Sequence, residues 1–469
     1  MASRASVIID AADYFVAAQS AMRKARHRIM LVGWDFDTRI RLGDNPGDEG
    51  EQTVGDFISA LVDATAGLEI YLLRWDMGAL KLLTRGSTAL TLLKWMSHPR
   101  IHTKLDGTHP TGASHHQKIV VVDDCMAFGG GIDMTSGRWD TRLHRDAEPG
   151  RIGPDGDPYP PWHDATSALE GPVAAALGDL CRDRWERAGC KALEQISGAT
   201  DCWPDGLPVD FENVEVAIAR SEPDMPGRPA VLEIERLYLD QIAGARRFIY
   251  AESQYFASRR IGEAIARRLD EDNGPEIVII NPVTSNGWLE PIAMDSARAR
   301  LFQALRRRDK HGRLRIYHPF TDAGAPIYAH AKLLIVDDDI LRVGSSNINN
   351  RSLRLDTECD IAIDARQGSN ASRVKAIRAI RDGLIAEHLD ETLQTVADAI
   401  DRSGSLIAAI ETLRPGKNRL RPYVVPDVEG VDKWLADNEI LDPEGPDEMF
   451  EPMTDRGLFR GGPFSRHES

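Results

Sequence analysis

The sequence feature that most constrains this chain is an octet that occurs twice. The copies are His116–Asp123 and His330–Asp337, and each reads His-x-Lys, four apolar residues, Asp. The same interval after each octet leads to a glycine-led tail, Gly130–Asp133 in the first copy and Gly344–Asn347 in the second. A repeat of this kind predicts two equivalent halves, and the polar residues present in both copies indicate a duplicated catalytic unit.

The polar pairs of the octets suit the chemistry of a phosphate diester. The four apolar residues predict a short buried strand. Its alternation places the histidine and lysine of each octet on one face, which pairs His116 with Lys118 and His330 with Lys332. A lysine ammonium neutralises non-bridging oxygens, while an imidazole attacks phosphorus or protonates a leaving oxygen. We therefore predict that these four residues are catalytic.

The tails supply candidate substrate-binding residues. Glycines such as Gly130 allow the backbone to approach a phosphate closely, and the Asn347 amide can donate a hydrogen bond to it. Ser345 completes this predicted set.

Two other interpretations of the octets deserve comparison. A single octet could merely cap a buried strand with polar residues, but two octets with matched tails disfavour that reading. A zinc site is conceivable because His115, His116, His144 and His163 are close in sequence. However, the chain has no Cys-x-x-Cys or His-Glu-x-x-His spacing, and lysine is not a usual ligand. We therefore expect no metal ion.

Composition limits the class of protein and its partners. The chain has 469 residues, of which 42% are hydrophobic and 28% are charged, and this composition is typical of a folded globular protein. Its net charge of −16 argues against an extended surface that binds nucleic acid and against strong electrostatic binding to anionic lipid. We expect a monomer that does not bind nucleic acid and whose membrane contact is peripheral, through apolar loops.

The expected compartment is the cytoplasm. The cysteines are odd in number and lack framework spacing, so we expect free thiols in a reducing environment. The N-terminus lacks an apolar h-region typical of a secretory signal, and no stretch reaches eighteen apolar residues. The five cysteines are Cys125, Cys181, Cys190, Cys202 and Cys359.

Helical and strand patterns alternate twice along the chain, which predicts an α/β fold. The strands Ile29–Trp34 and Glu69–Leu73 of the first half correspond to Phe248–Phe256 and Glu276–Ile280 of the second. A Gly-, Pro- and Asp-rich stretch, Ser197–Asn213, is the predicted linker. We expect halves at residues 1–200 and 201–405, followed by a C-terminal extension at 406–469.

Several segments together resemble the phospholipase D superfamily, and in particular its eukaryotic-type branch. The paired octet is the signature of that superfamily, and the resemblance covers roughly residues 10–390. The further matching segments are His115–Lys118, Gly129–Asp133, Gly137–Asp140, Glu252–Phe256 and Gly344–Asn349 with Arg351 and Ser352.

The resemblance implies a tandem duplicated α/β fold, with two mixed β-sheet halves flanked by helices around a pseudo-two-fold axis. It also implies a metal-independent phosphodiesterase that uses a phosphohistidine intermediate and needs no cofactor. By resemblance, His116 is the expected nucleophile and His330 the general acid, although the sequence does not separate these roles. Lys118 and Lys332 are expected to hold the phosphoryl oxygens, assisted by Asn347.

Each catalytic imidazole needs a carboxylate that fixes its far nitrogen. Glu358 matches the family position after the second motif, and Asp164 is the predicted counterpart in the first half. The alternative is that both are ordinary acidic residues at strand starts. We expect each octet to be supported by its own downstream carboxylate.

Three aspartates of the motifs have expected roles that differ from those of the histidines and lysines. Asp123 and Asp337 complete the catalytic octets, but we interpret them as structural partners and not as proton carriers. Asp133 stands where the second copy has an asparagine. Because a carboxylate would repel a diester, we expect Asp133 to face away from the site.

The expected reaction is hydrolysis of glycerophospholipids to phosphatidic acid and the headgroup alcohol, with transfer to other alcohols as a variant. One alternative is a phosphatidyltransferase of cardiolipin-synthase type, a class that usually carries N-terminal membrane helices. Another is a nuclease of the same superfamily, which the net charge of −16 disfavours. Intact histidines and lysines in both copies argue against a non-enzymatic scaffold.

Overall fold

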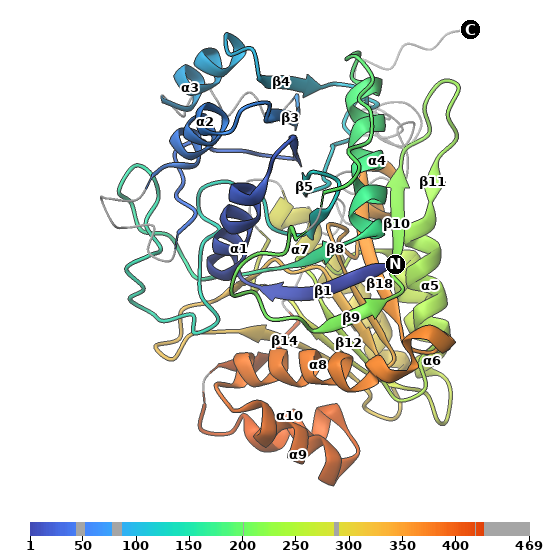
Figure 1. Ribbon diagram of the computed structural model, residues 1–469. Helices are drawn as coiled ribbons and strands as arrows, with labels where there is room; N and C mark the ends of the chain where they lie inside the picture. Colours follow the sequence, from blue (N-terminus) through green and yellow to red (C-terminus); the bar gives the residue numbers. More distant parts are fainter. Residues whose placement is uncertain (44–51, 77–86, 200, 286–289, 418, 426–469) are drawn as a thin grey trace, which may run out of the picture.

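The computed structural model contains two large mixed sheets, and it describes all residues except 44–51, 77–86, 200, 286–289, 418 and 426–469 (Figure 1). The first sheet has the order β4 (Ile101–Asp106), β3 (Glu69–Trp75), β2 (Arg28–Gly33), β5 (Ile119–Val122), β6 (Met126–Gly130), β8 (Ala165–Glu170), β1 (Ala2–Ile9), β9 (Phe211–Val214). The second has the order β11 (Val231–Leu232), β10 (Ala217–Glu222), β18 (Glu358–Asp364), β17 (Ile340–Gly344), β16 (Leu333–Val336), β12 (Phe248–Glu252), β13 (Glu276–Ile280), β14 (Leu314–Pro319), β19 (Leu420–Pro422).

The two sheets repeat one topology. In the first, β2, β3 and β4 run parallel, while β5, β6 and β8 pair antiparallel. In the second, β12, β13 and β14 run parallel, while β16, β17 and β18 pair antiparallel. The predicted tandem duplicated α/β fold with two mixed sheets is therefore confirmed.

Helices flank both sheets, and the second half carries two more than the first among the described residues. The first half contains α1 (Ala11–Lys24), α2 (Val54–Ala64), α3 (Ser87–Met96) and α4 (Pro172–Arg187). The second contains α5 (Glu233–Gly244), α6 (Arg259–Leu269), α7 (Glu290–Arg308), α8 (Val374–Leu389), α9 (Leu393–Ser403) and α10 (Leu406–Leu413), with short turns at Arg351–Leu355 and Gly368–Arg373. Side-chain N-caps explain where α2 and α6 begin, since Thr53 and Ser258 accept from N–H groups of the first turn.

The apolar run of each octet is buried on both faces of its strand. In β5, Ile119 and Val121 contribute to a core shared by both halves, whereas the alternate residues Val120 and Val122 pack into the first half's own core. The strand β16 alternates in the same way between the shared core and the core of the second half. Burial on two faces explains why these strands are uninterrupted apolar runs.

The sheets extend beyond the predicted limits of the two halves. The strand β9 begins inside the predicted linker and pairs with β1, so the first sheet continues to Val214. The strand β19 pairs with β14, and α10 contacts β13, so the segment after residue 405 continues the second half. Residues 426–469 of the predicted extension lie outside the described part of the chain.

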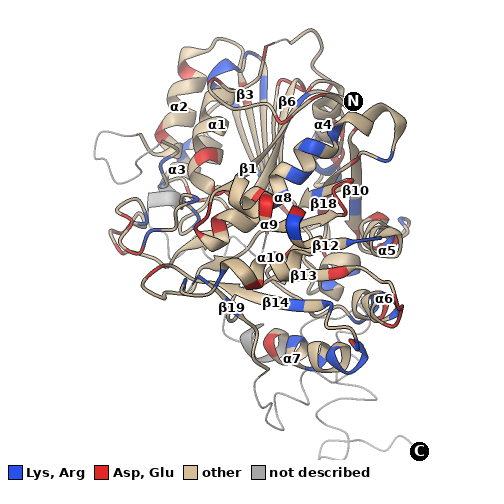
Figure 2. Ribbon diagram, turned by 90° about the horizontal axis from the view of Figure 1, so that it is seen from below, with Lys and Arg blue, Asp and Glu red and all other residues tan. Residues whose placement is uncertain are grey.

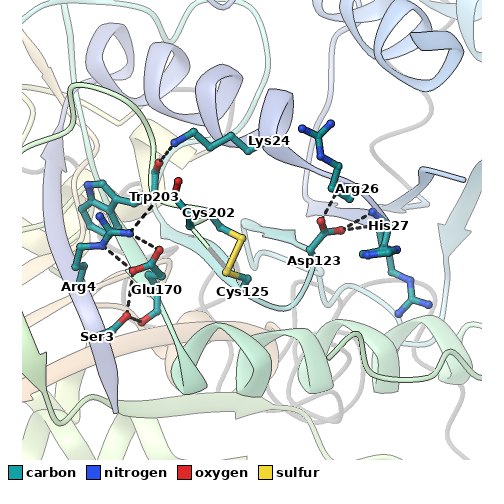
Figure 3. Close-up of a disulfide and its surroundings, with 12 residues drawn as sticks. Ser3, Arg4, Lys24, Arg26, His27, Asp123, Cys125, Glu170, Cys202 and Trp203 are labelled. Carbon is teal, nitrogen blue, oxygen red and sulfur yellow. Dashed lines mark hydrogen bonds and ion pairs between the residues drawn. A yellow bond between two sulfur atoms is a disulfide. The ribbon is translucent and has the colours of Figure 1, made fainter. Parts of the chain in front are cut away.

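The prediction that all five cysteines are free is wrong. The structure joins Cys125 to Cys202 by a disulfide, while Cys181, Cys190 and Cys359 are free thiols (Figure 3). Because β9 returns the linker to the first sheet, it brings two cysteines that are 77 residues apart to a Cα–Cα distance of 6.1 Å. Sequence spacing gave no sign of this pairing.

The aspartate at the end of each octet closes a helix-to-strand turn. The Asp123 carboxylate accepts hydrogen bonds from the backbone N–H groups of residues 26, 27 and 28, at 2.6–2.9 Å (Figure 3). The Asp337 carboxylate does the same with residues 246, 247 and 248, at 2.7–2.9 Å. Both aspartates therefore lie at the opposite end of the strand from the histidine, where their carboxylates stabilise the backbone of a turn.

We predict that Asp337→Asn lowers the free energy of unfolding by about 2 kcal/mol, because the new NH₂ group faces backbone donors that lose their acceptor. Urea denaturation measures this change. Asp272→Asn is the matched control, since its carboxylate is 98% exposed, and it should leave the unfolding midpoint unchanged. Equal midpoints for the two variants would contradict the structural role of Asp337.

No helix among the described residues is long and apolar enough to cross a membrane. Figure 2 shows basic and acidic segments mixed along helices such as α7, whose last turn carries Arg306, Arg307 and Arg308.

Candidate active site

The segment before the first histidine pairs with the segment before Glu358. The backbone N–H of His116 donates to the carbonyl of Thr357 at 2.9 Å. In return, the N–H of Thr357 donates to the carbonyl of Ser114 at 2.9 Å. This short parallel bridge fixes His116 of the first half against the start of β18 in the second half.

The second histidine is held by the reciprocal arrangement. The strand β7 (Trp162–His163) of the first half pairs in parallel with β15 (Tyr328–Ala329) of the second. Beyond this pair, the N–H of His330 donates to the carbonyl of His163 at 2.7 Å. Each histidine is thus aligned by backbone that belongs to the other half.

The orienting carboxylates are exchanged between the halves. His116 Nδ1 lies 2.9 and 3.1 Å from the two carboxylate oxygens of Glu358, and His330 Nδ1 lies 2.7 Å from Asp164 Oδ2. The expectation that each octet uses its own downstream carboxylate is therefore wrong. The cause is the reciprocal backbone pairing, which places the residue after each bridge beside the imidazole of the opposite half.

Both imidazoles are arranged to present Nε2 to the site. When Nδ1–H donates to the carboxylate, the Nε2 lone pair is left for chemistry. Burial, followed by the charge of nearby Lys118, lowers the pKa of His116 well below its usual range. Burial and Lys332 do the same to the pKa of His330. Both rings are therefore neutral at neutral pH, which is the form that a nucleophile requires.

The two carboxylates differ in their electrostatics. Burial acts to raise the pKa of Asp164, but His330 and Lys332 outweigh it, and the pKa falls to about 2. Burial raises the pKa of Glu358 well above its usual range, although Lys118 acts in the opposite direction. The two histidine–carboxylate pairs are therefore related by the duplication but not equivalent in charge.

Lys118 has a carboxylate partner inside the site. Its Nζ lies 3.1 Å from Asp133 Oδ2 and donates to the carbonyl of His116 at 2.9 Å. The other oxygen of Asp133 accepts from the backbone N–H groups of Trp34 and Asp35. The expectation that Asp133 faces away from the site is therefore wrong, because its charge is balanced by Lys118 and by two backbone donors.

Lys332 is held by uncharged oxygens instead. Its Nζ donates to the carbonyl of His330 and lies 3.5 Å from Gln254 Oε1, which also accepts from the Asn347 amide at 3.5 Å. Burial and the charge of Lys118 lower the pKa of Lys332 to about 7, against a partial offset from Asp164. An anion that enters the site would stabilise the charged form of the desolvated Lys332 side chain.

Gln254 is a site residue that our residue-level prediction missed. It joins Lys332 and Asn347, and its amide also donates to the Tyr328 hydroxyl at 2.9 Å. The signal was present, because Gln254 lies in the segment Glu252–Phe256 of the family resemblance, but a single sequence does not say what it contacts.

The two other predicted substrate-binding residues lie in supporting positions. Ser345 Oγ donates to Glu358 Oε2 at 2.5 Å. Gly130 packs so closely on β8 that a Cβ there would meet Thr166 Cα at 2.4 Å. Its neighbour Gly131 leaves room for Asp164, because a Cβ would meet that carboxylate at 2.2 Å. Direct contact of Ser345 and Gly130 with substrate remains a prediction.

Aromatic rings flank both imidazoles. Trp34 stacks on Trp75 and lies edge-on to His116, with ring centroids 6.4 Å apart. Trp162 stacks on Tyr328, and its centroid lies 5.0 Å from that of His330. These rings form aromatic walls beside the two imidazoles.

Comparisons with known proteins agree with this duplicated arrangement. The family model described as "Phospholipase D" matches residues 21–224, and the model described as "Cardiolipin synthase, PLD-like domain" matches residues 238–377. Phospholipase D alpha 1 of Carica papaya is 25% identical over 74% of this chain and 59% of its own length. Phospholipase D alpha 2 of Brassica oleracea var. capitata is 25% identical over 81% of this chain and 64% of its own length.

A solved structure shares the fold. The phosphatidylserine synthase of Haemophilus influenzae Rd KW20 superimposes with a TM-score of 0.56 at 15% identity, over 88% of this chain and 96% of that one. Two interlocked halves with one such site define a duplicated α/β class of fold. With family models matching both halves, the chain belongs to the phospholipase D superfamily. It spans only about 60% of the length of the plant relatives.

The lowered pKa of His330 predicts how stability depends on pH. Between this lowered value and the ordinary value of 6.5, the unfolded chain binds a proton that the folded chain does not. The contribution of His330 to stability should therefore rise with pH up to about 6.5 and then level off. Removing the ring in His330→Asn should reduce this slope by up to about 1.4 kcal/mol per pH unit.

Urea unfolding at several pH values between about 5 and 6.5 measures the slope. Gln254→Ala is the control, since it perturbs the same site without removing a titrating group and should keep the wild-type slope. An unchanged slope in His330→Asn would contradict a buried, neutral His330.

Proposed function

We propose that the protein hydrolyses glycerophospholipids to phosphatidic acid and the headgroup alcohol. The main support is the pair of neutral imidazoles, each fixed by a carboxylate of the other half and each beside a lysine. Family membership and the similarity to plant phospholipases D support a phospholipid substrate. The aromatic walls beside both imidazoles suit an amphipathic substrate better than a highly charged polymer.

In the first step, His116 Nε2 attacks phosphorus and forms a covalent phosphohistidine. The bond from phosphorus to the headgroup oxygen breaks, and that oxygen takes a proton from His330 Nε2. His330 is neutral in the free protein, but a bound diester anion offsets the charges of Lys118 and Lys332, which allows His330 to take up this proton with the substrate. Asp164 then stabilises the imidazolium.

In the second step, His330 accepts a proton from water, and the hydroxide displaces His116 from phosphorus. Phosphatidic acid is released, and His330 then gives up to solvent the proton that it accepted from water, so both histidines return to their neutral starting state. Lys118, Lys332 and the Asn347 amide hold the phosphoryl oxygens during both displacements. These steps use no metal ion or cofactor.

Transfer to a second alcohol is the nearest alternative. It replaces water by a hydroxyl compound in the second step and uses the same residues. The match of residues 238–377 to the family model described as "Cardiolipin synthase, PLD-like domain" favours testing it. A nuclease reading has less support, because the net charge is −16.

The substrate class is tested with mixed vesicles of phosphatidylcholine and phosphatidylethanolamine, assayed beside supercoiled plasmid. We expect release of choline or ethanolamine and formation of phosphatidic acid, with no plasmid cleavage. EDTA should not abolish the release, because the proposed steps need no metal. Glycerol added as an acceptor separates hydrolysis from transfer, since transfer would yield phosphatidylglycerol. Plasmid cleavage without lipid turnover would overturn the proposal.

We predict that His116→Ala and His330→Ala each reduce headgroup release by about 10³-fold or more, since each step needs both imidazoles. His318→Ala is the matched control: it removes a buried histidine that bonds the carbonyl of Asn281, outside the site. Near-normal activity in either catalytic variant would exclude a single shared site.

The roles of the two histidines separate with a substrate whose leaving group is p-nitrophenolate, which needs no proton. With His330→Ala we expect a burst of about one nitrophenolate per enzyme, followed by a stall at the covalent intermediate. With His116→Ala we expect no burst. The reverse pattern would make His330 the nucleophile.

A further inference from the structure

Behind the active site, four buried side chains from separate parts of the chain converge. Asp10 follows β1, His144 lies in a loop, His163 is in β7 and Glu387 is on α8. Their side chains are at most 2% exposed. One potential ligand atom from each lies within 4.8 Å of the others. We refer to these residues as the tetrad.

The spacing within the tetrad fits a tetrahedral cation. His163 Nδ1 lies 3.0 Å from Glu387 Oε1 and 3.3 Å from Asp10 Oδ1. His144 Nε2 lies 3.3 Å from Glu387 Oε1 and 3.4 Å from Asp10 Oδ2. Metal–ligand bonds of about 2.0–2.2 Å give tetrahedral ligand–ligand edges of roughly 3.3–3.6 Å. Three of the measured distances, 3.3–3.4 Å, lie near these edges, and the His163–Glu387 distance of 3.0 Å is shorter. Asp10 offers Oδ1 to His163 and Oδ2 to His144.

Hydrogen bonding among the described residues leaves part of this cluster unsatisfied. His163 Nδ1 forms no hydrogen bond, despite its short distance to Glu387. Asp10 Oδ2 is also buried without a hydrogen-bond donor. Both atoms nevertheless lie close to other members of the tetrad, His163 Nδ1 beside Glu387 and Asp10 Oδ2 beside His144. Buried polar atoms in this state require an explanation, and a bound cation supplies one.

The far nitrogen of each histidine is held by another carboxylate. His144 Nδ1 lies 3.0 Å from Asp140 Oδ2, whose other oxygen accepts from Arg151. His163 Nε2 lies 2.7 Å from Glu252 Oε2. A carboxylate on the second ring nitrogen is the usual way to orient a histidine that binds zinc.

The backbone is also shaped to bring these ligands together. Asp10 and His144 adopt positive φ angles of 67° and 43°. Asp10 occupies the N-cap position of α1, yet its carboxylate makes no cap hydrogen bond and turns into the tetrad instead. Such conformations persist where the surrounding structure requires them.

We propose that Asp10, His144, His163 and Glu387 bind one zinc ion in a closed structural site. Two imidazoles and two carboxylates are a zinc-compatible ligand set. Asp10 and Glu387 supply two negative charges, and the other oxygen of Glu387 also pairs with Arg142 at 2.5 Å. The site uses two of the histidines that sequence reasoning considered for zinc, but it adds carboxylates that are distant in sequence. It revises the expectation of no metal ion and does not depend on the proposed reaction.

The site would connect to the catalytic machinery through Asp164. The backbone N–H of Asp10 donates to the carbonyl of Asp164 at 2.8 Å, and Asp10 Oδ1 accepts from the N–H of Asp164 at 3.0 Å. His163 precedes Asp164 directly in the chain. Because Glu387 comes from the second half, the ion would join the two halves beside the carboxylate that orients His330.

Metal analysis of the full chain tests the proposal. Protein purified from zinc-supplemented cells and dialysed against metal-free buffer should contain about one zinc per chain by mass spectrometry. Glu387→Gln and His144→Ala should retain less than about a tenth of this zinc. His318→Ala, which removes a buried histidine outside the tetrad, should retain all of it. Refolding with Co²⁺ should give the visible absorption of tetrahedral cobalt in the wild type.

The zinc content of the wild-type protein tests the proposal even if a variant fails to fold. Wild-type protein that takes up no zinc, either as purified or on refolding with excess Zn²⁺, would overturn the proposal. A different bound metal would overturn the assignment to zinc, and full zinc in Glu387→Gln would overturn the ligand set. These readouts are independent of lipid hydrolysis, so failure of either proposal leaves the other intact.

Discussion

The exchange of carboxylates between the two halves is the interaction on which the site depends. Glu358 of the second half holds His116, and Asp164 of the first half holds His330. Both contacts follow from short parallel backbone bridges that join the halves. Neither half alone therefore contains an oriented histidine, and assembly of the duplicated fold is also assembly of the site.

Burial sets the protonation states of both histidines and of Lys332 in the site. The shared core draws on both sheets, and Lys118, His330 and Lys332 are buried while His116 is partly buried. Desolvation keeps both imidazoles neutral and lowers the pKa of Lys332 to about 7. The halves then diverge, because Asp133 balances Lys118 whereas Asn347 shares Gln254 with Lys332. A duplicated sequence has thus produced two electrostatically different positions in one site.

Much of the fold was predictable, because its signals are local. The runs Ile119–Val122 and Leu333–Val336 form the expected strands, and Glu276–Ile280 has the expected limits. Features that depend on contacts between segments distant in the sequence were either not predicted or predicted wrongly. The end of the predicted linker joins the first sheet through β9, and Cys202 of the same linker forms a disulfide with Cys125. No local pattern records that Ala5 has an antiparallel partner as distant in the sequence as Phe211.

The sequence by itself determined the duplication, the histidine–lysine pairs, the family and the candidate carboxylates, because each is a pattern of residue types at fixed spacing. Tertiary structure decided which carboxylate serves which histidine, since the partners are 242 and 166 residues apart. It also decided that Asp133 faces Lys118 and that Asp10 and Glu387 meet His144 and His163. These outcomes depend on how two sheets pack, and burial then makes each contact strong enough to govern charge.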